Sequence, residues 1–90
     1  MSFCEKCIIT GIVQGVFFRA STQQKANDLG VTGYARNIEQ GHVEVLACGP
    51  AEAVGHLKAW LWEGPPNSHV SNVKCELIED IEIPNSFEIR

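Results

Sequence analysis

The segment Gly11–Arg19, with the sequence GIVQGVFFR, holds the residues of this chain best suited to chemistry. Its glycines interrupt an apolar stretch, and its arginine stands where a helix is expected to begin. Backbone N–H groups exposed between a strand and a helix can bind an anion, and the helix dipole strengthens that binding. A guanidinium matches the oxygens of a phosphate two at a time. The segment therefore predicts a small protein that handles a phosphate group.

Arg19 is the side chain that points most clearly to a ligand. The dipole of a helix disfavours a cation at the N-terminus by about 0.3–1 kcal/mol. An arginine in that position suggests an anionic partner, although an ordinary surface arginine is the alternative reading of the same residue.

Hydrophobic patterning predicts the elements that must hold this loop in place. We expect four longer strands, two helices, a hairpin turn and a short final strand. The strands are expected at 6–13, 33–37, 42–48, 70–78 and 87–89, the helices at 21–29 and from 49–50 to 64, and the turn at 39–41. This order is the split βαβ pattern of an α+β, ferredoxin-like fold (βαββαβ). It predicts a four-stranded antiparallel sheet, a short C-terminal fifth strand and two helices on one face.

This topology makes Asn37 a candidate residue of the same site as Arg19. By itself it reads as a turn asparagine that satisfies local backbone groups. In the split βαβ arrangement, however, the first two strands run parallel with the third strand between them. The ends of the first two strands then lie at one edge of the sheet, and Asn37 comes within reach of the loop that carries Arg19. An amide there could hold a water molecule while the arginine holds the electrophile.

Strand parity, the alternation of successive side chains between the two faces of a sheet, predicts the face on which each of the four cysteines lies. Cys4 and Cys48 are expected side by side on the helix-free face, while Cys7 and Cys75 fall on the helix-covered face as small apolar side chains. A four-cysteine zinc site would need ligands on both faces, so we expect no metal site. A Cys4–Cys48 disulfide is geometrically possible, but we expect free thiols instead, as is usual in a cytoplasmic protein.

Composition limits the remaining classes of function. Ninety residues fit one domain, 1–90, and no segment reaches the roughly 20 apolar residues of a membrane span. The N-terminal residues are too polar for a secretory signal, so we expect a cytoplasmic protein. A net charge of −4 argues against nucleic-acid binding, which calls for a basic face. We expect a monomer, although the sequence does not fix the oligomeric state.

Three segments together resemble the acylphosphatase family: GIVQGVFFR, then GYARN at 33–37, then GHVE at 41–44. They follow in order and at matching spacing, and the resemblance covers about residues 6–90. Ile38 stands where many relatives carry a threonine, which bears on fine positioning and not on the family. The resemblance implies hydrolysis of acyl phosphates to a carboxylate and inorganic phosphate, with no metal or other cofactor.

The resemblance also implies a role for each site residue. Arg19 matches the arginine that binds the phosphate, and Asn37 matches the asparagine that positions the attacking water. The residues that match the cradle of backbone N–H groups around the phosphate are Gln14, Gly15, Val16, Phe17 and Phe18.

Other readings of the chain predict different observations. A ferredoxin-like module that binds a ligand or a metal without catalysis would share the fold. A copper carrier would use a CxxC motif in the loop after the first strand, but Cys4 and Cys7 come before that loop. An accessory domain that handles carbamoyl phosphate would need a partner domain. None of the three histidines, His42, His56 and His69, is expected at the edge of the sheet where the loop lies.

Overall fold

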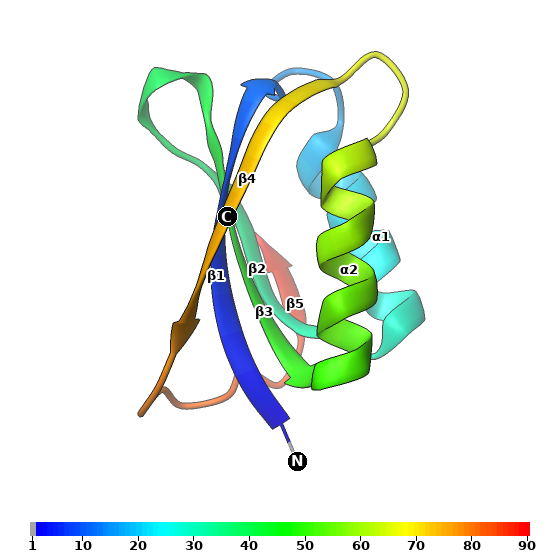
Figure 1. The fold of residues 1–90 in the computed structure, drawn as a ribbon. Helices are drawn as coiled ribbons and strands as arrows, with labels where there is room; N and C mark the ends of the chain where they lie inside the picture. The colour runs from blue at the N-terminus through cyan, green and yellow to red at the C-terminus, as the bar shows by residue number, and fades with distance from the viewer. Residues whose placement is uncertain (1) are drawn as a thin grey trace.

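In the computed structural model, which describes residues 2–90, five strands form one sheet and two helices cover one of its faces (Figure 1). The strands are β1 (Ser2–Ile12), β2 (Thr32–Asn37), β3 (Val43–Pro50), β4 (His69–Ile78) and β5 (Phe87–Ile89). The helices are α1 (Phe18–Leu29) and α2 (Ala51–Glu63), and a single 3-10 turn, η1 (Glu39–Gly41), joins β2 to β3. The α+β fold predicted from the sequence is confirmed.

The order of strands in the sheet is β4-β1-β3-β2-β5, so β3 lies between β1 and β2. β1 pairs antiparallel with β3 and β4, β2 pairs antiparallel with β3, and the short β5 runs parallel to β2. Val43, at the start of β3, is paired with Ile9 on one side and with Asn37 on the other. The C-terminal ends of β1 and β2 therefore meet at one edge of the sheet.

The main core lies between the sheet and the two helices. The helix-facing side chains of the central strands are fully buried, as period-2 alternation requires, and α2 contributes the predicted apolar stripe Val54, Leu57 and Leu61. On α1, Thr22 is buried and donates a hydrogen bond from its hydroxyl to the carbonyl of Phe18 at 2.8 Å. This core fixes both helices against the sheet.

Several boundaries differ from those predicted because tertiary contacts extend the elements. Helix α1 begins at Phe18 rather than Ser21, since the Phe18 side chain is buried and its ring lies 6.0 Å from that of Trp60 on α2. Helix α2 begins at Ala51, because Pro50 is the last residue of β3 and has extended dihedral angles. Strand β1 begins before Lys6, where its residues pair with the end of β3.

The prediction of free thiols is wrong, because the structure pairs all four cysteines. Cys4 forms a disulfide with Cys48, and Cys7 forms a disulfide with Cys75. Parity placed each cysteine on the correct face, but Cys7 and Cys75 are directly opposite across β1 and β4 and are not isolated apolar side chains. Strand β1 is thus linked covalently to β3 on one face of the sheet and to β4 on the other.

The helix-free face carries a buried carboxylate. Glu44 is 7% exposed and accepts hydrogen bonds from the hydroxyl of Tyr34 and from Nε of Arg36, each at 2.7 Å. Burial by itself would raise the pKa of Glu44, but the hydrogen bonds from Arg36 and Tyr34 and the charge of Arg36 outweigh it and hold the pKa below its usual range. Burial and the hydrogen bond to Glu44 raise the pKa of Tyr34.

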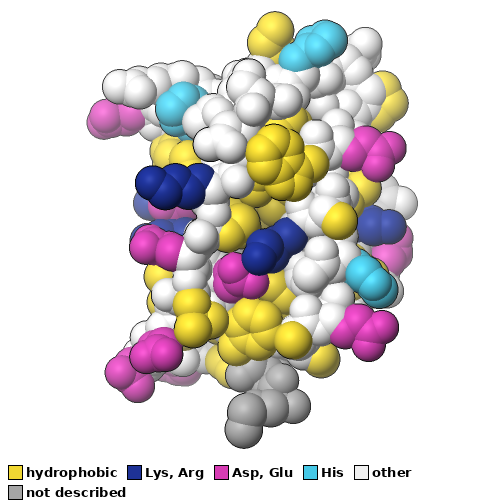
Figure 2. All heavy atoms as spheres, viewed as in Figure 1, with side chains coloured by type: hydrophobic (Ala, Val, Ile, Leu, Met, Phe, Trp, Pro, Cys, Tyr) yellow, Lys and Arg dark blue, Asp and Glu magenta, His cyan; other side chains and the backbone are white. Residues whose placement is uncertain are grey.

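The surface shows no continuous basic patch on the face in view. Charged side chains of both signs lie beside one another there (Figure 2), and the whole chain has a net charge of −4. Among residues 2–90 neither helix has the length and apolar character needed to cross a membrane.

The two disulfides predict the thiol content and the effect of reduction. Unfolded in denaturant without reductant, the protein should expose no free thiols, and it should expose all four after reduction. Each bridge closes a long loop, so reduction should lower the free energy of unfolding by about 2–4 kcal/mol per bridge. Thiol titration and thermal melts with and without reductant test this. Titration of two or four thiols in the protein as isolated, never exposed to reductant, would contradict it.

The pKa of Glu44 predicts a pH-dependent contribution to stability. Because the pKa of Glu44 is lower in the folded protein than in the unfolded chain, its carboxylate stabilises the fold above the ordinary carboxyl pKa. This stabilisation is lost as the pH falls through the pKa that Glu44 has in the folded protein. Glu44→Gln should lower the melting temperature at pH 7 by about 4–8 °C, and the difference from the parent should shrink in acid. Glu88→Gln is the control, since Glu88 belongs to an exposed ion pair with Arg90. If the two substitutions lower the melting temperature equally at pH 7, the buried Glu44 carboxylate does not stabilise the fold in this way.

Candidate active site

The candidate site begins where β1 leaves the sheet. The pairing of β1 with β4 shifts register between Thr10 and Gly11, which marks a β-bulge. Gly11 has a φ of 128°, and a Cβ added there would collide with the backbone carbonyl oxygen of His69. Only glycine fits this close approach. The bulge ends regular pairing and lets the chain turn into the loop before α1.

The backbone of the loop has dihedral angles suited to binding an anion. Gly15 and Phe17 have φ values of 74° and 61°, in the left-handed region, and alternation of such dihedral angles with ordinary ones builds an anion-binding nest. Among residues 2–90, no amide of the loop 14–17 donates to a backbone acceptor outside a helix or strand. Phe17 is the N-cap of α1, and no side chain caps this helix terminus. The donors at the junction are therefore free to bind a ligand.

Two residues of the loop hold it in place instead of lining the site. The side-chain amide of Gln14 donates to the carbonyl oxygens of Ile38 at 3.0 Å and His42 at 2.8 Å. It thereby ties the loop to the connection between β2 and β3. Val16 packs against the main core. The shape of the loop is fixed from both sides before any ligand binds.

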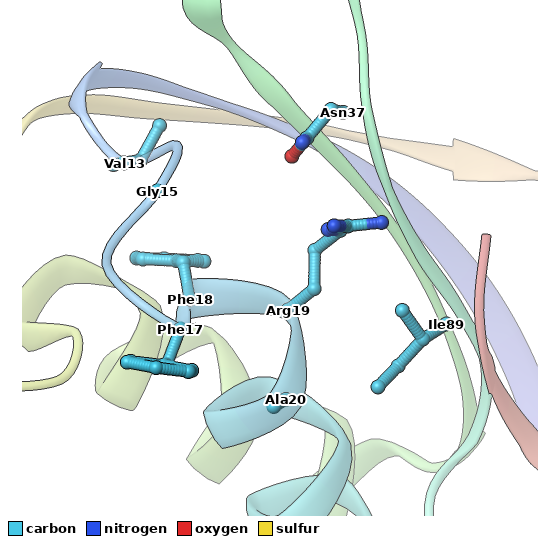
Figure 3. Close-up of a pocket in the computed structure, with 8 residues that line it drawn as sticks. All are labelled: Val13, Gly15, Phe17, Phe18, Arg19, Ala20, Asn37 and Ile89. Atoms are coloured by element: carbon cyan, nitrogen blue, oxygen red, sulfur yellow. The ribbon is translucent and has the colours of Figure 1, made fainter.

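A cavity of about 370 Å³ lies beside the loop and brings Arg19 and Asn37 together. Figure 3 shows the two side chains projecting toward one another, from the start of α1 and the end of β2. The lining residues are Val13, Gly15, Phe17, Phe18, Arg19, Ala20, Asn37 and Ile89. Of the sequence-predicted loop residues, Gly15, Phe17 and Phe18 border this cavity, and Gln14 and Val16 do not.

The guanidinium of Arg19 is oriented by the residue that follows β5. Its Nη1 donates to the backbone oxygen of Arg90 at 2.7 Å. The amide of Arg90 donates to the carbonyl of Ala35 at 2.9 Å, and its guanidinium lies 4.3 Å from the ring centre of Tyr34. Within residues 2–90, Arg19 forms no ion pair with a carboxylate side chain. Its remaining N–H donors are available to an anion in the cavity.

Sequence reasoning missed three residues that line the cavity, namely Val13, Ala20 and Ile89. Val13 and Ala20 directly flank the predicted loop, so a wider window would have included them. Nothing in the sequence indicated that Ile89 lies at the cavity, because the pattern of a short final strand does not show which edge of the sheet that strand joins. The parallel pairing of Ala35 with Ile89 supplies that information, and the side-chain amide of Gln23 on α1, which donates to the carbonyl of Phe87 at 2.9 Å, holds the strand there.

The prediction that no histidine lies at this edge of the sheet is wrong for two of the three. The carbonyl of His42 accepts a hydrogen bond from Gln14, and His69 pairs with Ile12 at the end of β1. The secondary-structure element of each histidine is not enough to locate it, because its position along the sheet depends on which residues pair across neighbouring strands. Neither side chain lines the cavity, and no group of three or more His, Cys, Asp or Glu side chains within the described residues could hold a metal ion.

Comparison with known proteins identifies the family. The acylphosphatase family model matches residues 5–89. The chain is 61% identical over 84 residues to an acylphosphatase of Halorhodospira halophila, covering 93% of this chain and 90% of that protein. It is 52% identical over 90 residues to an acylphosphatase of Nitrosococcus oceani, covering both chains completely.

Solved structures agree with the sequence comparison. An acylphosphatase from Coxiella burnetii superposes with a TM-score of 0.93 at 44% identity, covering 99% of this chain and 93% of that one. An acylphosphatase from Bacillus subtilis superposes with a TM-score of 0.94 at 31% identity, covering 100% and 99%. The fold, the sequence match and the loop that joins β1 to α1 lead to one conclusion: this chain belongs to the acylphosphatase family.

Proposed function

We propose that this protein hydrolyses acyl phosphates to a carboxylate and inorganic phosphate. The observation that carries the proposal is that Arg19, Asn37 and a loop with free backbone N–H groups border one cavity. The family and the names of its relatives support the same reaction. A binding module without catalysis is not favoured by these comparisons.

The phosphoryl group binds to the loop and to Arg19. Backbone amides of the loop, in which Gly15, Phe17 and Phe18 border the cavity, surround its non-bridging oxygens, and the guanidinium of Arg19 neutralises their charge. Each charge-assisted hydrogen bond contributes on the order of 1.5–3 kcal/mol. Because the Arg90 carbonyl and the core contacts of the loop hold these donors in place before binding, little reorganisation is needed when charge develops in the transition state.

Asn37 positions the water that attacks. Its amide holds the water oxygen in line with the bond between phosphorus and the acyl oxygen. The water oxygen bonds to phosphorus while the bond between phosphorus and the acyl oxygen breaks. The electron pair of the broken bond leaves with the carboxylate. An acyl phosphate is already activated by this stable leaving group, so positioning and charge stabilisation supply most of the catalysis.

No protein base is needed in this scheme. Among the described residues that line the cavity, Arg19 has the one ionisable side chain, and a guanidinium has no acceptor for a proton. The proton of the attacking water therefore passes to the oxygens of the phosphoryl group itself. We further propose that the reaction needs no metal and that the protein acts as a single domain and a monomer.

Arg19 provides the first test of the site. Arg19→Ala should lower kcat/KM for benzoyl phosphate by on the order of 10²–10³-fold, because the transition state loses its principal cation. Phosphate release is measured with EDTA present throughout, and the parent should be equally active with and without the chelator. Lys25→Ala, a change of a cation on the same helix, is the control. If Arg19→Ala hydrolyses as fast as the parent, the site is misassigned.

Asn37 should affect turnover without affecting phosphate binding. Asn37→Ala should lower kcat by about 10²-fold or more, because the water is no longer held in line, while inorganic phosphate still inhibits or binds with the parent's affinity. Calorimetry with inorganic phosphate and steady-state kinetics separate these two effects. Asn72→Ala on β4 is the matched control. A parallel loss of phosphate affinity in Asn37→Ala would show that Asn37 supports the loop instead of the water.

A further inference from the structure

The cavity holds more than a phosphate-binding loop. Its volume of about 370 Å³ falls in the range of small-ligand sites, about 300–1,000 Å³. Arg19 and Asn37 are its polar side chains, and both are occupied by the reacting phosphoryl group and water in the proposed reaction. The remaining side chains of the lining are apolar: Val13, Phe17, Phe18, Ala20 and Ile89. The acyl part of the substrate has only this apolar wall to contact.

Phe17 is the most unusual part of that wall. Its side chain is 83% exposed, and its φ of 61° lies in the left-handed region, where a bulky residue is an outlier. An exposed apolar residue is common by itself, but this aromatic side chain borders the cavity next to the phosphate-binding arginine, on backbone that the loop itself holds in the left-handed region. The fold gains little from this ring, since it is the next residue, Phe18, that is buried in the core.

Ile89 provides a second exposed apolar side chain at the same cavity, from a different element. It is 42% exposed and comes from β5, across the cavity from the loop. Figure 3 shows Ile89 on the far side of Arg19 from Phe17. The phosphate-binding arginine is therefore flanked by apolar side chains on two sides.

Within residues 2–90, the lining of the cavity has no second cation for an acyl group that carries its own negative charge. Arg36, which precedes Asn37 on β2, pairs with Glu44 at 2.7 Å, and the guanidinium of Arg90 lies over the ring of Tyr34 and pairs with Glu88 at 3.4 Å. Neither arginine lines the cavity. A carboxylate or second phosphate on the acyl group would lose water against an apolar wall without gaining a partner, which is unfavourable.

We infer that the protein selects acyl phosphates whose acyl group is neutral and apolar, aromatic or branched aliphatic, through contacts with Phe17 and Ile89. This inference rests on the proposed hydrolysis. Selectivity of this kind comes from apolar surface that is buried only when the acyl group is large enough to reach both side chains.

The experiment compares kcat/KM for benzoyl, acetyl and succinyl phosphate. The parent should prefer benzoyl over acetyl phosphate by about tenfold or more, as expected for additional apolar contacts in a pocket, and should use succinyl phosphate least well. Phe17→Asn tolerates the left-handed backbone and removes the ring. It should lower the ratio of kcat/KM for benzoyl phosphate to kcat/KM for acetyl phosphate by about tenfold, because the ring that contacts the larger acyl group is lost.

A matched pair of substitutions tests the second contact. Ile89→Thr should lower the preference for benzoyl over acetyl phosphate, whereas Ile12→Thr should not, since Ile12 is also an exposed strand isoleucine (60%) but does not line the cavity. Equal use of all three substrates by the parent, or an equal loss for all three in Phe17→Asn, would overturn the inference while leaving hydrolysis established. Failure of the parent to hydrolyse any of them would overturn the proposed function as well.

Discussion

The placement of β3 between β1 and β2 is the constraint on which the site depends. Because β3 runs antiparallel to both neighbours, β1 and β2 point the same way and end at the same edge of the sheet. The loop that leads to Arg19 follows the C-terminal end of β1, and Asn37 is the last residue of β2. Residues separated by a whole helix and strand in the sequence thus share one cavity, and neither has to be carried there by a long, mobile segment.

The surrounding structure makes that edge rigid. Strand β1 is joined by disulfides to both of its neighbours, and the buried ring of Phe18 fixes the first turn of α1 against α2. Gln14 ties the loop to the carbonyls beside η1. A site that works by positioning and charge stabilisation depends on such support, because small displacements of the donors weaken transition-state binding.

Local patterns predicted the order of elements, the alternating faces of the strands and the juxtaposition of the loop with Asn37. They failed where the answer depended on which strands become neighbours in the sheet. Parity placed Cys7 and Cys75 on one face, but only the register of β1 with β4 sets them opposite each other. In the same way, nothing in the residues Phe87–Ile89 reveals that β5 pairs with β2 and brings Ile89 and the Arg90 carbonyl to Arg19.

The central claim is that the junction of β1 and α1, with Arg19, binds the phosphoryl group. Titration of inorganic phosphate into ¹⁵N-labelled protein, followed through the amide resonances, tests it most directly. The account predicts saturable shifts concentrated at the amides of residues 14–19 and at Asn37. Saturable shifts confined to another part of the surface, such as the Tyr34, Arg36 and Glu44 cluster on the helix-free face, or no saturable shifts at all, would contradict it.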